Sequence, residues 1–310
     1  MLNRRHLRVK VLQSLYAFFQ AGGNDLAKGE KELLHGIEKI YDLYIYQLLL
    51  LSELLHIAEL IIEDKKIKKL PTPEDLNPNT KFINNKLLRE IRDNSFVRKI
   101  ANEKKISWNE HHEMIRKLYQ QIAQSKHFAK YMAKESIDVN SDVDFIIDIL
   151  LDEICNFELL HSYYEESSIY WLDDWEMVNK MLVKTLKGFS EKQNSRFELM
   201  NLYKDPDDKV FAIELFRKTI LNSDEISPMI SKRTQNWEIE RIALMDILIM
   251  KMAITEILKF PEIPVKVTLN EYIELSKMYS TPKSKIFVNG VLDKLVEEFY
   301  ETKKINKLVK

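Results

Sequence analysis

Basic residues gather at both ends of the chain. Residues 1–20 carry no acidic side chain but hold four cations, and the last eight residues hold four lysines and no acid. Since the 310-residue chain has a net charge of only −1, each end is a local concentration of positive charge, which is typical of an anion-binding face. Charge alone leaves open the alternative of solvated, frayed ends. The N-terminal cations are Arg4, Arg5, Arg8 and Lys10.

The tetrapeptide Glu-Leu-Leu-His occurs three times, at residues 32–35, 53–56 and 158–161. Glu and His three residues apart share one face of a helix, and two such pairs with two further Glu residues form the di-iron carboxylate sites of helical bundles. The first two copies lie on one long predicted helix, about 30 Å apart, so they cannot share a metal ion unless that helix breaks. A metal-binding bundle is therefore a secondary hypothesis.

Motifs of catalysis and cofactor binding are missing from the sequence. It contains no Gly-rich phosphate loop, no Gly-x-Ser-x-Gly elbow and no cysteine pair for zinc. The single cysteine, Cys155, lies in an apolar helical stretch, which indicates a buried and inert thiol. Asp144, Asp148 and Asp152 form a stripe that is either a solvated face or a docking face for a basic partner. We expect neither enzymatic activity nor a cofactor.

The composition favours an all-α fold. The chain has room for about two domains, yet it contains only 6 glycines and 8 prolines, too few for the tight turns of β-sandwiches, barrels and Gly-loop nucleotide folds. One cysteine excludes an intramolecular disulfide and suggests a reducing compartment. No uncharged run of about 18 apolar residues predicts a membrane span, and the N-terminus does not resemble a secretory signal. The expected location is the cytoplasm.

Helical periodicity runs through most of the chain. A first helix over 4–20 presents a stripe of Leu7, Val11, Leu15 and Phe18, with the basic residues mostly off that stripe. A long helix over 26–70 follows, apolar nearly all round at 43–62, and we expect it to be buried within a packed helical subdomain. Capping boxes are predicted at Ser107 and at Thr268, and Thr281 is a predicted N-cap. Further helices are predicted at 82–93, 108–133, 143–165, 169–187, 209–222, 224–232, 237–260, 269–279 and 283–300.

Three motifs in the last hundred residues carry a resemblance. After the apolar helix of 239–259, residues 263–277 read I-P-V-K-V-T-L-N-E-Y-I-E-L-S-K and residues 287–294 read F-V-N-G-V-L-D-K. This segment resembles the C-terminal half of the NusB family of bacterial transcription antitermination factors. Residues 4–8, R-R-H-L-R, and 12–16, L-Q-S-L-Y, resemble the basic start and first helix of that family.

The resemblance implies a divided domain. It covers about residues 1–25 and 207–300, so we expect residues 1–25 and 206–310 to form one NusB-like helical bundle, interrupted by a helical insertion of unknown role at 26–205. The first helix should pack its apolar stripe on the helices of 207–300, since a short isolated helix is marginal. Gly290, inside a predicted helix, indicates a close helix–helix approach. Thr255, Tyr272 and Lys283 depart from the residues usual in the family.

The resemblance also implies a function. Such a protein would bind the boxA element of nascent ribosomal RNA jointly with the small-subunit ribosomal protein NusE, within the transcription elongation complex and away from membranes. Single-stranded RNA needs cations for its phosphates and flat groups for its bases. Tyr16 and Phe287 could equally be core residues, and a helical protein-docking scaffold is a further alternative. The residues expected to bind RNA, with the start of the last helix adjacent to the N-terminal cluster, are Arg4, Arg5, Arg8, Lys10, Tyr16, Lys283, Lys285 and Phe287.

Overall fold

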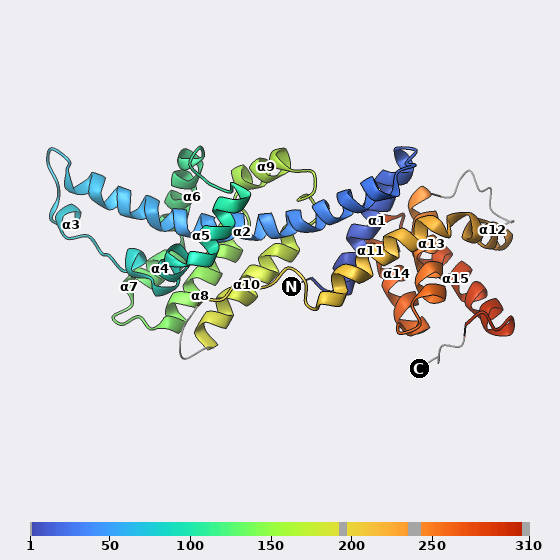
Figure 1. The fold of residues 1–310 in the computed structure, drawn as a ribbon. Helices are drawn as coiled ribbons and strands as arrows, with labels where there is room; N and C mark the ends of the chain where they lie inside the picture. The colour runs from blue at the N-terminus through green and yellow to red at the C-terminus, as the bar shows by residue number, and fades with distance from the viewer. Residues whose placement is uncertain (1, 192–196, 235–242, 306–310) are drawn as a thin grey trace. The chain divides into compact units, whose positions relative to one another are not determined.

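The fold is all-α, as predicted. The computed structural model describes residues 2–191, 197–234 and 243–305, and in this part of the chain the regular elements are all helical. The structure divides into two compact units, which Figure 1 shows in chain colours. Unit 1 comprises residues 1–37 and 203–310, and unit 2 comprises residues 38–202.

Unit 1 joins the two ends of the sequence. The first helix is anchored by Asn3, whose side chain accepts a hydrogen bond from the backbone N–H of His6. It packs on α11 (Pro206–Leu221) and α13 (Leu244–Lys259), as expected. Its Phe18 ring meets the Phe216 ring of α11 edge to face, with 5.9 Å between centroids. The start of α2 also belongs to this unit. Its helices are α1 (Arg4–Gln20), α11 (Pro206–Leu221), α12 (Ser223–Arg233), α13 (Leu244–Lys259), α14 (Val265–Tyr279) and α15 (Ser284–Glu301).

The first three turns of α2 (Leu26–Lys66) extend unit 1 to Ile37. A Cβ atom on Gly29 would lie 2.8 Å from the Phe216 ring and 2.9 Å from the Phe18 ring, so glycine allows this helix to approach closely. Beside it, Arg217 donates two hydrogen bonds to Glu30, at 2.7 and 2.9 Å. The contacts therefore divide the chain twelve residues later than the expected break after residue 25.

The glycines give a testable contrast in stability. Gly29→Ala is expected to lower the free energy of unfolding by about 1–3 kcal/mol, because the added methyl group overpacks two aromatic rings. For Gly188 in α10 (Trp175–Glu191) and Gly290 in α15, no described atom beyond the chain neighbours and the helix's own backbone lies within 4 Å of an added Cβ. The close approach expected at Gly290 is therefore wrong, and alanine at either position should stabilise its helix by up to about 1 kcal/mol. Urea denaturation of the three variants checks this, and equal effects at all three would contradict it.

Unit 2 is a packed helical unit built on the rest of α2. Leu43, Leu48, Leu51 and Leu55 are fully buried along this helix. By length and composition α2 could also cross a membrane, but half of that apolar window is buried inside the protein. The other helices of unit 2 are α3 (Pro73–Leu76), the 3-10 turn η1 (Phe82–Asn84), α4 (Lys86–Asp93), α5 (Ser95–Lys104), α6 (His112–Gln124), α7 (Lys126–Ala133), α8 (Val139–Ile149), the π-helical turn η2 (Leu150–Ile154), α9 (Glu158–Ser167) and α10 (Trp175–Glu191).

Several predicted helix boundaries are wrong. The capping box at Ser107 does not form, since α6 begins at His112, and the helix predicted at 143–165 is broken by the turn η2. The helix α5, whose first turn is capped by Asn94, is absent from the helices predicted from the sequence. α15 begins at Ser284 without a side-chain cap, and the Thr281 hydroxyl lies 2.8 Å from the hydroxyl of Ser284 instead. The hydroxyls of Ser107 and Thr281 therefore do not cap the helices predicted to follow them.

Cys155 is expected to be chemically inert, which a thiol titration can check. Burial raises the pKa of Cys155 to about 11, so only about one molecule in a thousand carries the thiolate at pH 8. Native protein should therefore react with iodoacetamide far more slowly than urea-unfolded protein at the same pH. Equal rates in the two states would show that this thiol is accessible and ionised.

Candidate nucleic-acid interface

The centre of unit 1 is a buried ion pair between its two sequence halves. Arg8 on α1 is 3% exposed, and its guanidinium donates two hydrogen bonds of 2.8 Å each to the carboxylate of Glu256 on α13. Glu256 is fully buried. Bidentate geometry is the strongest form of this interaction, and it fixes the rotation of α1 against α13.

The remaining acceptor capacity of Glu256 is filled by α14. The hydroxyl of Thr268 donates to one carboxylate oxygen at 2.8 Å, and the hydroxyl of Tyr272 donates to the other at 3.1 Å. Burial alone would lower the pKa of Arg8, but its hydrogen bonds to Glu256 and the charge of that carboxylate outweigh burial and raise the pKa. Every charge in this core is therefore compensated, as a buried pair requires.

Aromatic rings cover two of the three arginines, Arg4 and Arg8. The Arg8 guanidinium lies 5.2 Å from the centroid of the Phe211 ring and 5.9 Å from that of Tyr272, and the Arg4 guanidinium lies 4.9 Å from the Phe211 centroid. These are cation–π distances. The first turns of α1 are thus held by α11, α13 and α14 together.

The outer arginines are paired as well. Arg5, 47% exposed at its side chain, donates two hydrogen bonds of 2.8 Å to Glu271, and Arg4 lies 3.5 Å from Asp208. Hydrogen bonding to Arg5 lowers the pKa of Glu271 despite its partial burial. The Arg5–Glu271 pair therefore stabilises the fold fully at pH values above 4.5, the ordinary pKa of a glutamate. This stabilisation is lost as the pH falls through the lowered pKa of Glu271.

The N-terminal cluster is therefore not a patch of free positive charge. Its three arginines face three carboxylates, which the fold brings from residues more than 200 positions away. A groove of about 460 Å³ runs beside the cluster, lined by Arg4, Arg5 and Arg8 together with Glu262 and Glu271. The expectation that the cations lie off the buried face is wrong for Arg8 and also for Lys10, which is only 4% exposed.

The start of α15 presents a different electrostatic surface. Lys283 and Lys285 are exposed, and neither forms an ion pair with an acid among the described residues. The next residue, Ile286, is 72% exposed, and Phe287 after it is half-buried. A hydrogen bond of 2.7 Å from Ser284 to the buried Asp246 fixes this turn against the first turn of α13.

The two basic sites lie at opposite ends of α13 and not side by side as expected. Arg8 contacts Glu256, whereas Ser284 contacts Asp246, and these two acids are separated by about 15 Å of helix. Tyr16 is located two turns beyond Arg8 on α1, 39% exposed, and its hydroxyl accepts a hydrogen bond from Gln20. A ligand touching both sites has to follow the length of these helices.

The acids of this arrangement are absent from the site residues that the sequence predicts. The sequence predicts a capping box at Thr268 and Glu271, but α14 begins at Val265, four residues before the predicted start. Glu271 accepts hydrogen bonds from Arg5, and Thr268 donates to Glu256, the partner of Arg8. The available signal was Glu256, the one charged residue in the run 252–258, in which every other residue except Thr255 is apolar. A lone charge in such a run is expected to have a buried partner.

The Glu-Leu-Leu-His copies do not converge. His161 bonds through its ring to the carbonyl oxygen of Cys155 at 2.6 Å, and the copies at 32–35 and 53–56 remain on the unbroken helix α2. Among the described residues, no group of three His, Cys, Asp or Glu side chains is arranged to hold a metal ion. The geometry gives the metal-binding hypothesis no support.

These features define an all-α protein in which the first helix and the last five form one unit around a buried Arg–Glu pair. Residues 167–297 match the NusB family. The transcription antitermination protein NusB of Dictyoglomus turgidum is 39% identical over 100 residues, which cover 32% of this chain and 69% of the relative. That of Thermodesulfovibrio yellowstonii is 34% identical over 146 residues, 47% of this chain and 78% of the relative. The chain belongs to the NusB family.

Similarity is stronger but shorter in a further relative. The NusB protein of Salinibacter ruber is 45% identical over 106 residues, which are 34% of this chain and 66% of that protein, just under two thirds of its length. No solved structure matches the chain. Much of unit 2 therefore lies outside the part of the chain that the family describes.

Proposed function

We propose that this protein is an RNA-binding transcription antitermination factor of the cytoplasm. It binds boxA-type nascent ribosomal RNA together with the small-subunit ribosomal protein NusE and acts on the transcription elongation complex by binding, not by catalysis. Membership of a family of transcription antitermination proteins supports the role in transcription. The RNA and the ribosomal partner follow from the resemblance of the N-terminal and C-terminal motifs.

The observation that carries the proposal is the uncompensated basic turn at the start of α15. Lys283 and Lys285 have no described acid partner, so they are available to phosphates, and Phe287 supplies a flat group one turn into the helix. In unit 1, Arg4 and Arg5 reach solvent while paired and can exchange a carboxylate for a phosphate. The buried Arg8 and Lys10 are assigned a positioning role, and Tyr16 a stacking role between the two basic sites.

Equilibrium binding of the full-length protein tests this function. A boxA-like RNA should bind more tightly than a scrambled RNA of the same length, and added NusE should tighten boxA binding by roughly five- to 150-fold, the usual range of coupling between two ligands. NusE should have a much smaller effect on the scrambled RNA. Equal affinity for both RNAs, with no effect of NusE on either, would overturn the proposal.

A further inference from the structure

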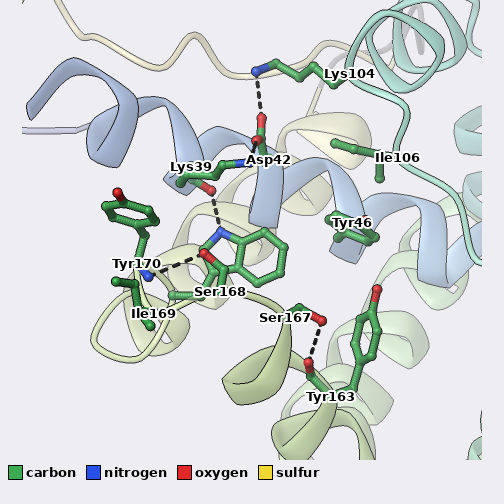
Figure 2. Close-up of a pocket in the computed structure, with 11 residues that line it drawn as sticks. Lys39, Asp42, Tyr46, Lys104, Ile106, Tyr163, Ser167, Ser168, Ile169 and Tyr170 are labelled. Atoms are coloured by element: carbon green, nitrogen blue, oxygen red, sulfur yellow. Dashed lines mark hydrogen bonds and ion pairs between the residues drawn. The ribbon is translucent and has the colours of Figure 1, made fainter. Parts of the chain in front are cut away.

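Unit 2 contains a cavity of about 530 Å³ that the function of unit 1 does not use. It opens between α2, the end of α5, α9 and the loop that follows α9, and Figure 2 shows the side chains around it. Its volume lies within the range of small-molecule sites in proteins, roughly 300–1,000 Å³. The cavity combines a charged edge with an aromatic wall.

The charged edge carries an excess of one positive charge. Asp42 is held by two lysines, with Lys104 Nζ at 2.6 Å from one carboxylate oxygen and Lys39 Nζ at 3.0 Å from the other. Asp42 is the only acid that lines the cavity within the described chain. About 30% of each lysine side chain is exposed, so both ammonium groups can accept an incoming anion as a further partner.

The aromatic wall is rigid. The indole N–H of Trp171 donates a 2.7 Å hydrogen bond to the carbonyl oxygen of Lys39, and the Tyr46 and Trp171 ring centroids are 5.4 Å apart. Tyr163 lies beside Tyr46, with 6.4 Å between their centroids. Figure 2 shows the rings of Tyr46 and Tyr163 below the Lys39–Asp42–Lys104 group. Tyr46 and Tyr163 are half-buried, so part of each remains accessible to a planar ligand.

We propose that this cavity binds a nucleotide, with its phosphate at Lys39 and Lys104 and its base against Tyr46 and Tyr163. Cations for the phosphate and aromatic groups for the base are the two elements by which proteins hold unpaired nucleotides. A free nucleotide and a nucleotide within single-stranded RNA share this chemistry. The site belongs to unit 2 and does not depend on the interface proposed in unit 1, so either proposal can fail alone.

Three variants that change the charge at or near the cavity test the phosphate site. Calorimetry measures how tightly each full-length variant binds adenosine monophosphate. Lys104→Ala leaves Asp42 paired with Lys39, so it removes the excess charge without stranding a carboxylate, and affinity should fall about tenfold. Asp42→Asn adds one positive charge to the site, and affinity should rise. Lys99→Ala, on the same helix as Lys104 but 70% exposed and outside the cavity, should change nothing. Circular dichroism confirms that each variant is folded.

The choice of ligand tests the aromatic wall and identifies the source. Ribose 5-phosphate, which lacks the base, should bind roughly five- to 150-fold more weakly than adenosine monophosphate. An adenosine hexanucleotide that binds with the same response to Lys104→Ala and Asp42→Asn identifies single-stranded RNA as the ligand, whereas binding of the monophosphate alone identifies a free nucleotide. The proposal would be overturned if neither nucleotide probe binds at millimolar concentration. It would also be overturned if Lys104→Ala and Asp42→Asn leave the affinity of both probes unchanged.

Discussion

Arg8→Ala is expected to lower the free energy of unfolding of unit 1 by about 3–5 kcal/mol, because it leaves the buried carboxylate of Glu256 without a compensating charge. The remaining hydroxyls of Thr268 and Tyr272 are too weak as donors to replace a guanidinium. Native-state hydrogen exchange of α1 and α13 measures this loss within unit 1 and separates it from unit 2. A loss below about 1 kcal/mol would contradict the structural role of the pair.

Two further variants isolate the cause. Arg5→Ala removes the arginine one turn before Arg8 on α1, whose ion pair with Glu271 is partly exposed. It should lower the free energy of unfolding by no more than about 1 kcal/mol. Arg8→Met combined with Glu256→Gln should recover much of the stability lost in Arg8→Ala, because no charge is then buried alone and the amide oxygen still accepts hydroxyl hydrogen bonds. If the double variant is no better than Arg8→Ala, lost packing and not the stranded charge explains the effect.

Replacing Lys283 and Lys285 with alanine should weaken boxA binding and make the negative slope of log affinity against log salt concentration shallower by about 1.4. Each lysine is exposed without a described acid partner, and each phosphate contact on a single strand contributes about 0.7 to that slope. Fluorescence titrations between 50 and 200 mM salt provide the measurement. Because both lysine side chains are exposed, the free energy of unfolding should stay within about 0.5 kcal/mol of that of the parent protein.

Matched variants distinguish this effect from general loss of charge. Lys277→Ala and Lys294→Ala remove exposed lysines from neighbouring turns of unit 1 and should leave the salt slope unchanged. Phe287→Ala should weaken binding by about 1–3 kcal/mol with nearly the same slope, since stacking releases no counterions. An unaltered slope in the Lys283 and Lys285 variant would place the RNA on another face of unit 1.

The position of Arg8 illustrates what periodicity could and could not predict. A stripe of apolar residues fixes which face of α1 is buried, and that stripe is correct at Leu7, Val11 and Leu15. Because Arg8 lies off that stripe, in a cluster of cations, the sequence predicts it as an RNA-binding residue. Its actual partner, Glu256, is 248 residues away, and a pairing over that distance has no local signal on α1.

The two basic sites also show which features composition predicts and which the fold decides. The amino-acid types at residues 4–8 and 283–287 correctly marked two places where cations concentrate, because charge is a property of composition. Whether a cation is free depends on the acids around it. The fold brings Asp208, Glu256 and Glu271 to the first cluster and leaves Lys283 and Lys285 without such neighbours among the described residues.

The sequence by itself determined the helical class, most helix positions and the membership suggested by the C-terminal motifs, because helical periodicity, turn residues and motifs are encoded over a few neighbouring positions. Only the tertiary structure decided that α2 belongs in part to unit 1, that the two basic sites lie at opposite ends of α13, and that the arginines of the first helix are neutralised. These features are contacts between residues distant in sequence, whose energy depends on burial and on the geometry of both partners, and neither quantity exists until the helices have packed.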